Sequence, residues 1–213
     1  VRARFISGTV GTVLEVQARP AKVWVGSTFT VTGRLTTEQG DPLAGRTVAV
    51  SAPGAALRVV TDSDGRFWCA LRAPYLYTDN ITITATYVPE ADDIGSFRPS
   101  SASVQVKLLY ETPRLNLSLA PETVLPGDSV YVTLQADRPG LNVTVEAFGS
   151  ATRARLESIE ARLAITVPPW ATEGVYPIYA RSQPQGTTGP ATAQALLRVV
   201  KLDVNLTRLS VPG

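Results

Sequence analysis

The side chains that carry most enzyme chemistry are nearly absent from this 213-residue sequence. It has no His, which excludes Ser-His-Asp and Cys-His nucleophiles, a neutral imidazole base and His-ligated zinc. Its one cysteine, Cys69, excludes an intrachain disulfide and a cysteine cluster for a metal. Nothing in the pattern places a base beside a nucleophile or pairs two carboxylates across a cleft. We therefore expect a protein that is not an enzyme.

The asparagines are the residues whose spacing does indicate chemistry. The sequence has four Asn, and each begins an N-x-S/T glycosylation sequon. Ser and Thr make up 38 of the 213 residues, so four matches by chance have a probability on the order of 0.001, before allowing for the Thr that alternating strands favour. N-glycans belong to exported chains, so we expect an extracellular, cell-surface glycoprotein. The predicted acceptors are Asn80, Asn116, Asn142 and Asn205.

Acidic residues in two loops are the candidates for a metal ion. Asp62 and Asp64 match part of a calcium loop, and Asp92 with Asp93 forms a second acidic group. The further oxygen ligands of a calcium loop do not follow, whereas Asp64-Gly65 between two strands is a preferred hairpin turn. The pattern favours the turn. Calcium is kept as the alternative, and no other cofactor is expected.

These residues are positioned by strands from one end of the chain to the other. Segments such as 28–35, 81–87, 115–119 and 130–134 alternate apolar and polar residues, and Gly and Pro turns separate them every 8 to 12 residues. The segment 151–164 also has apolar residues at helical spacing, so one short helix is an alternative there to two strands joined near Glu157. The predicted fold class is all-β, with antiparallel immunoglobulin-like sandwiches.

An internal repeat predicts where the modules begin. The stretch from Leu14 to Pro20, followed by Gly26 and a strand, recurs from Leu115 to Pro121, followed by Gly127 and a strand. The spacing of about 100 residues is an immunoglobulin-domain length. The predicted organisation is the end of a preceding module or a free strand (1–11), a first sandwich (12–109), a linker (110–112), a second sandwich (113–200) and the first strand of a third module or a donor strand (201–213).

The alternation also predicts what each face carries. In the first module, Leu35, Val48, Ile83, Tyr87 and Val106 are expected in the core; in the second, Leu117, Val132, Val143, Leu163 and Ile165 are. Cys69 lies in phase with core positions and is expected to be an inert buried thiol. Trp68 then points outward, where it could stack on a sugar ring or pack against a loop. Trp170 is expected to plug one end of the second sandwich.

The last segment carries an apolar stripe that needs a partner. Its apolar positions are Leu202, Val204, Leu206 and Leu209, with Val211 beyond them. An unpaired strand of this kind promotes association, so we expect it against the second module, a third module or another chain. In the last case the chain would be a filament subunit joined by donor-strand exchange.

Several of these segments resemble known surface modules. Residues 31–35, 40–48, 61–67 and 83–87 resemble bacterial immunoglobulin-like and carboxypeptidase-regulatory-like repeats, and 125–129 with 166–176 resembles related archaeal and bacterial modules. The resemblance implies a stalk, spacer or adhesion role, and it brings no catalytic residues.

Composition narrows the partners. The net charge of +2 predicts no nucleic-acid partner, and the absence of a long apolar run predicts no membrane insertion by this segment. The expected partners are other modules of the same surface protein, copies of the chain, and N-glycans, with a carbohydrate-binding module as a more distant alternative. Sequons without paired cysteines, the excess of Arg over Lys and the absence of Met predict an archaeal source.

Overall fold

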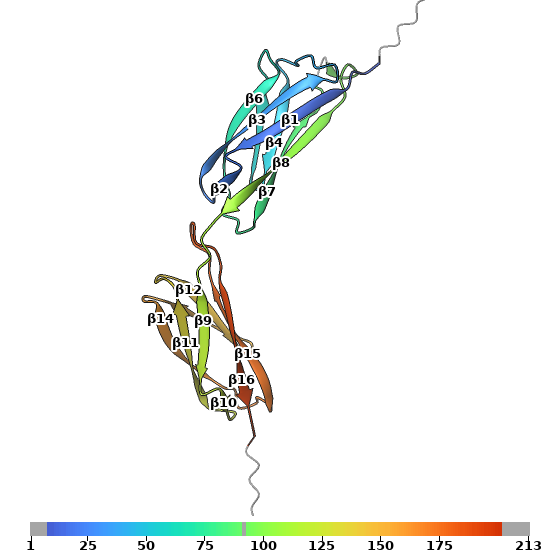
Figure 1. Ribbon diagram of the computed structural model, residues 1–213. Coiled ribbons are helices and arrows are strands. Elements are labelled where there is room, and N and C mark those ends of the chain that lie inside the picture. The colour runs from blue at the N-terminus through green and yellow to red at the C-terminus, as the bar shows by residue number, and fades with distance from the viewer. Residues whose placement is uncertain (1–7, 91–92, 202–213) are drawn as a thin grey trace, which may run out of the picture. The chain divides into compact units, whose positions relative to one another are not determined.

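The chain divides into two compact units, Val1–Tyr110 and Glu111–Gly213 (Figure 1). A computed structural model describes residues 8–90 and 93–201. These residues hold sixteen β-strands and no α-helix, so the chain is all-β as predicted. None of the described residues forms a helix long and apolar enough to cross a bilayer. The predicted strand within 1–11 falls largely outside the described residues, and the one within 202–213 falls wholly outside them.

The first unit is a sandwich of a three-stranded and a five-stranded sheet. Its strands are β1 (Thr12–Arg19), β2 (Lys22–Trp24), β3 (Thr28–Thr37), β4 (Thr47–Ala52), β5 (Ala55–Val60), β6 (Arg66–Arg72), β7 (Asn80–Tyr87) and β8 (Ser100–Leu109). The small sheet has the order β1-β3-β6 and the large one β2-β8-β7-β4-β5. Every pair is antiparallel except β2, which runs parallel to β8.

The second unit repeats this arrangement. Its strands are β9 (Leu115–Ala120), β10 (Thr123–Val124), β11 (Ser129–Ala136), β12 (Asn142–Ala147), β13 (Ser150–Arg155), β14 (Glu160–Thr166), β15 (Gly174–Ser182) and β16 (Thr192–Val199). The small sheet has the order β9-β11-β14, the large one has the order β10-β16-β15-β12-β13, and β10 runs parallel to β16. The two units are therefore the same sandwich built twice.

Local details of the repeat match as well. The first strand of each unit ends at a cis peptide bond, before Pro20 and before Pro121. The turn that follows uses Gly26 and Gly127, whose φ angles of 79° and 92° are readily adopted only by glycine. The sequence repeat that predicted the modules is thus a repeat of backbone conformation.

Each unit has its own hydrophobic core. In the first, all five predicted core residues are buried, none with more than 1% of its surface exposed. In the second, Val132 and Val143 are buried as predicted, whereas Leu117, Leu163 and Ile165 are only partly buried and pack against the core. These three lie on β9 and β14, the outer strands of the three-stranded sheet, which have a neighbour on one side only.

The segment 151–164 resolves into the two strands β13 and β14, so the helix alternative is wrong. Leu156, between them, is fully buried and donates its backbone N–H to the carbonyl of Leu141. Ile159 is 60% exposed although a helix would place it on the same face as Leu156. The apparent helical spacing arises because a turn separates two strands of different sheets.

Two further side-chain predictions have opposite outcomes. Cys69 is buried as expected, and this burial raises the pKa of its thiol. Trp170, expected to plug the second sandwich, is 69% exposed. Val167 and Ala171, on either side of it in the sequence, are the buried residues of that turn and belong to the core in its place.

Candidate functional site

Three of the four sequon asparagines lie on exposed sheet faces. Asn80 begins β7, Asn142 begins β12, and Asn116 is the second residue of β9; all three side chains are exposed. Each alternates with buried neighbours, such as Ile81 at 4% exposure and Val143 at 1%. Period-two alternation therefore points these amide groups away from the cores, where a glycan has room. Asn205 lies outside the described residues.

The carboxylate of Asp62 is engaged within its own turn. Its Oδ1 accepts backbone N–H bonds from Asp64 at 2.9 Å and from Arg66 at 2.8 Å, and Gly65 follows with a φ of 72°. Hydrogen bonds of this kind are how Asp stabilises a turn. Asp64 lies in this turn, and Arg34 donates to its backbone carbonyl.

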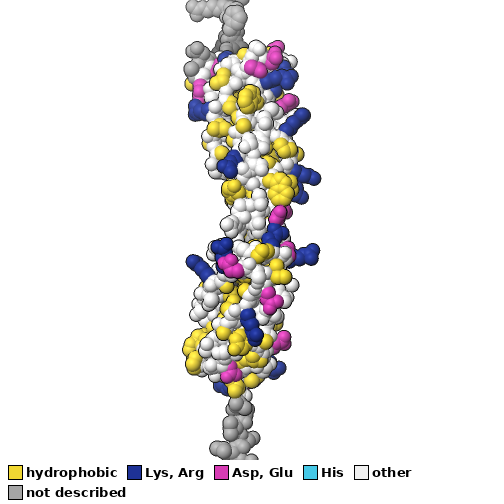
Figure 2. Space-filling view, turned by 90° about the vertical axis from the view of Figure 1, so that its left-hand side faces the viewer, with side chains coloured by type: hydrophobic (Ala, Val, Ile, Leu, Met, Phe, Trp, Pro, Cys, Tyr) yellow, Lys and Arg dark blue, Asp and Glu magenta, His cyan; other side chains and the backbone are white. Residues whose placement is uncertain are grey.

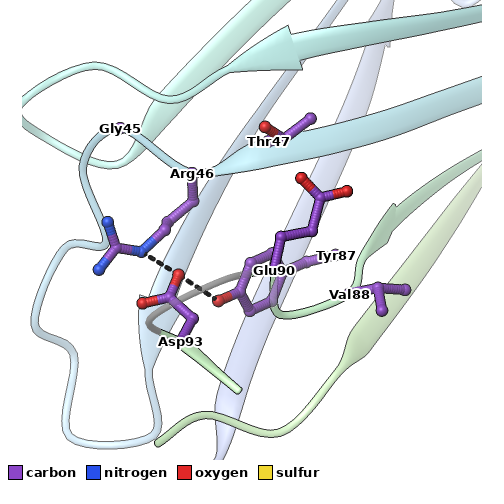
Figure 3. Close-up of a pocket in the computed structure, with 7 residues that line it drawn as sticks. All are labelled: Gly45, Arg46, Thr47, Tyr87, Val88, Glu90 and Asp93. Atoms are coloured by element: carbon purple, nitrogen blue, oxygen red, sulfur yellow. Dashed lines mark hydrogen bonds and ion pairs between the residues drawn. The ribbon is translucent and has the colours of Figure 1, made fainter.

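Asp93 belongs to a partly buried cluster of polar side chains that the sequence did not reveal (Figure 3). Its Oδ2 lies 2.5 Å from Nε of Arg46 and accepts a 3.1 Å hydrogen bond from the Tyr87 hydroxyl. The Arg46 guanidinium also lies over the ring of Phe97, 5.8 Å from its centroid. The cluster lines a depression of about 280 Å³, together with Gly45, Thr47, Val88 and Glu90. Arg46 and Asp93 are far apart in the sequence, so no local motif indicates the contact.

The pKa of Tyr87 indicates that this cluster stabilises the fold. Burial, together with the hydrogen bond and the negative charge of Asp93, raises the pKa of Tyr87 to about 12, and Arg46 partly opposes this rise. A phenol with so high a pKa is a poor acid and holds its proton as a donor to Asp93. Through the ion pair of Asp93 with Arg46, the connection between β7 and β8 is held against the start of β4.

The described acidic residues do not assemble a metal site. Among residues 8–90 and 93–201, no three His, Cys, Asp or Glu side chains are grouped closely enough to hold an ion. Asp62 and Asp64 are in the turn above, and Asp93 is paired with Arg46. Asp92 lies outside the described residues.

A second surface feature lies on the outer face of the β1-β3-β6 sheet. Trp68, on β6, is 70% exposed and stands beside a shallow depression of about 560 Å³. Across the sheet it is in register with Thr32, which in turn pairs with Gln17. The next row across the sheet is formed by Glu15, Arg34 and Arg66. We call this surface the Trp68 groove.

The same face of the second unit has different side chains. The row that corresponds to Gln17, Thr32 and Trp68 is Ser118, Thr133 and Arg162. The Arg162 guanidinium covers the ring of Tyr131, 4.1 Å from its centroid. The row that corresponds to Glu15, Arg34 and Arg66 is Asn116, Gln135 and Glu160, so a sequon occupies this face.

Charge is distributed without a dominant sign on the face shown in Figure 2. There, Lys and Arg side chains are interspersed with Asp and Glu side chains over both units. On this face neither sign of charge forms a continuous patch.

Comparison with known proteins shows likenesses of structure alone. No protein-family model matches the chain, and no curated protein matches it in sequence. Solved structures that are similar include the Yersinia pseudotuberculosis adhesin InvE (13% identity, TM-score 0.41), a 1.5-MDa bacterial ice-binding adhesin (15%, 0.38) and a Ca²⁺-stabilised adhesin of an Antarctic bacterium (14%, 0.39). They match 87%, 92% and 91% of this chain, which spans 58%, 66% and 49% of theirs. They assign no function to this chain.

Proposed function

We propose that this segment is a non-enzymatic extracellular spacer with a structural and adhesive role, built of tandem β-sandwiches in an archaeal cell-surface glycoprotein. The observation that carries the proposal is that one sandwich is built twice, with sequon asparagines on its outer faces in both units. A repeated module adds length without adding a new fold, and glycans on its exposed faces keep it hydrated. The unpaired cysteine and the Arg-rich composition support an archaeal source.

The parallel strand pair suits each unit to bear tension. The chain enters a unit through β1 and β2 and leaves it through β8, which lies beside β2. Pulling the two ends apart therefore slides β2 and β8 past each other, so that their hydrogen bonds are loaded together. These include Lys107 N–H to the Ala21 carbonyl at 2.9 Å and Val25 N–H to the Leu109 carbonyl at 3.1 Å.

The second unit has the equivalent parallel strand pair, β10 with β16. Arg198 donates to the carbonyl of Glu122, and Val200 donates to that of Val124, both at 2.9 Å. These bonds join β10 to β16 as their counterparts join β2 to β8. A spacer under tension needs this resistance to unfolding in every module, because the module that unfolds at the lowest force limits the force that the whole spacer can bear.

The sandwich architecture supports a spacer over the filament alternative. In donor-strand exchange, an incoming strand completes a sheet that lacks one. Each unit here already contains its own last strand, β8 or β16, in the five-stranded sheet. A donor segment 202–211 would instead have to extend an outer strand such as β5 or β13.

Light scattering after size exclusion tests the proposal. We would compare the full chain with a chain that lacks residues 202–213. The spacer proposal expects both to be monomers over a wide range of concentration. A full chain that assembles with rising concentration, beside a truncated chain that stays monomeric, would replace the spacer with the filament.

A further inference from the structure

We propose that the Trp68 groove binds a chain of neutral pyranose sugars. This inference is independent of the spacer role and of the N-glycans proposed above. The starting observation is that Trp68 has 70% of its surface exposed on the outer face of the β1-β3-β6 sheet. Sugar rings present a face of C–H bonds that stacks on such a surface, and an aromatic side chain contributes a large contact area at low entropic cost.

The Trp68 ring is free to receive a ligand. In the part of the chain that the structure describes, no aromatic ring and no cation covers it. The second unit provides the contrast, because there Arg162 at the equivalent position is stacked on Tyr131 of its own sheet. An exposed ring without such a cover keeps its stacking surface for a partner.

Hydrogen-bonding groups beside the indole fit sugar hydroxyls. Gln17 and Thr32 share a row with Trp68, and Glu15 and Arg66 lie in the adjacent row. The side chains of Glu15 and Gln17 are exposed and make no hydrogen bond or ion pair with any described residue. A carboxylate accepts hydrogen bonds and an amide both donates and accepts, which is the combination that vicinal hydroxyl groups require.

Charge and shape select a neutral, extended ligand. Two cations, Arg34 and Arg66, and two carboxylates, Glu15 and Asp62, line the groove, so it favours neither sign. The depression is open and shallow beside an exposed ring, whereas sites for small molecules enclose most of the ligand surface. A sugar chain lying across the three strands matches these features better than an ionic or fully enclosed ligand.

The predicted N-glycans would leave the groove accessible. Asn80, the one sequon asparagine of the first unit, is on the outer face of the five-stranded sheet. The Trp68 groove is on the opposite sheet of the same sandwich. In the second unit the corresponding sheet carries Asn116 itself.

The indole N–H signals of the three Trp residues provide a direct assay in heteronuclear NMR spectra. Maltohexaose, mannohexaose, xylohexaose and chitohexaose would each be titrated into the full chain up to tens of millimolar. We expect at least one of them to shift the Trp68 signal in a saturable manner. Trp68→Ala should weaken this binding by more than about tenfold, measured on backbone signals of β1 and β3, because a central Trp contributes most at such contacts.

Matched variants separate binding from folding. Gln17→Ala should weaken binding several-fold, while Trp170→Ala, which removes an equally exposed Trp from the second unit, should leave it unchanged. Unshifted Trp24 and Trp170 signals in Trp68→Ala would show that the fold is intact.

The inference is overturned if none of the four oligosaccharides shifts the Trp68 signal, or if binding persists in Trp68→Ala. A Trp68 signal that moves with protein concentration alone would assign the groove to a second copy of the chain instead.

Discussion

The two units share one backbone plan and differ in what their outer faces carry. Val31 in β3 and Val132 in β11 are both fully buried at equivalent positions, and Gly26 and Gly127 form equivalent turns. On the outer face, by contrast, Trp68 corresponds to Arg162. Inward positions specify the sandwich, whereas outward positions can change their chemistry without changing the fold.

The connection between the last two strands of each unit, β7 to β8 and β15 to β16, likewise has the same position in both units but different side chains. In the first unit Tyr87 at the end of β7 donates to Asp93, which is paired with Arg46. In the second unit Ser182 at the end of β15 occupies the equivalent place and accepts a 2.8 Å hydrogen bond from the backbone N–H of Ala191. In both units a buried polar side chain has a hydrogen-bond partner. The longer connection of the first unit is held by more polar side chains than that of the second.

The largest expected effect comes from the equivalent core valines. Val31→Ala and Val132→Ala each remove two methyl groups from a fully buried side chain, which should cost about 2 kcal/mol. Because each unit has its own core, we expect each change to lower the melting transition of its own unit alone. Calorimetry of both variants measures this. A loss of only a few tenths of a kcal/mol would show that the strand phase is wrong.

The contacts of Asp93 in the first unit should contribute more to the free energy of unfolding than the hydrogen bond of Ser182 in the second. Asp93→Ala leaves the Tyr87 hydroxyl and the Arg46 guanidinium without their partner, at a cost of about 2 kcal/mol, whereas Ser182→Ala removes one neutral hydrogen bond and should cost about 1 kcal/mol. Denaturant titration gives both values. Glu90→Ala is the control, because its ion pair with Arg58 is exposed and should contribute less than about 0.5 kcal/mol. Equal losses in all three variants would contradict the distinction.

The first unit should also respond to alkaline pH through Tyr87. Its pKa is raised from 10.0 to about 12, so folding favours the neutral phenol. This contribution is fully present below pH 10 and is lost as the pH rises to about 12. We expect Tyr87→Phe to remove that loss from the first unit, measured as the difference in unfolding free energy between the two pH values. An unchanged pH dependence in Tyr87→Phe would refute the role of this phenol.

The smallest effect is expected at the sequon asparagines. In protein made without glycans, Asn80→Gln, Asn116→Gln and Asn142→Gln should each change the unfolding free energy by less than about 0.5 kcal/mol, because all three side chains are exposed. Thermal unfolding monitored by circular dichroism is sufficient. A loss above 1 kcal/mol at any of them would indicate a structural role.

The sequence predicted the features that follow from local patterns, namely which side chains of a strand are buried and where the module repeats. Alternation placed Ile83 inside and Trp68 outside, and the recurring turn at Gly26 and Gly127 revealed the duplication. It could not reveal the contact of Arg46 with Asp93, because only the folded sandwich brings them together. Trp170 was placed wrongly, since its size suggested a plug, while the smaller neighbours Val167 and Ala171 form the buried part of that turn.

The most direct test of the spacer account is mass spectrometry of glycopeptides from protein isolated from its native cell surface. The account predicts that the peptides containing Asn80, Asn116 and Asn142 carry glycan masses, and that Asn205 does as well. Removing the glycans in ¹⁸O-enriched water with an enzyme that hydrolyses the glycosylated side-chain amide would convert each acceptor Asn into an ¹⁸O-labelled Asp. Unmodified asparagine at all four positions in native material would contradict the account.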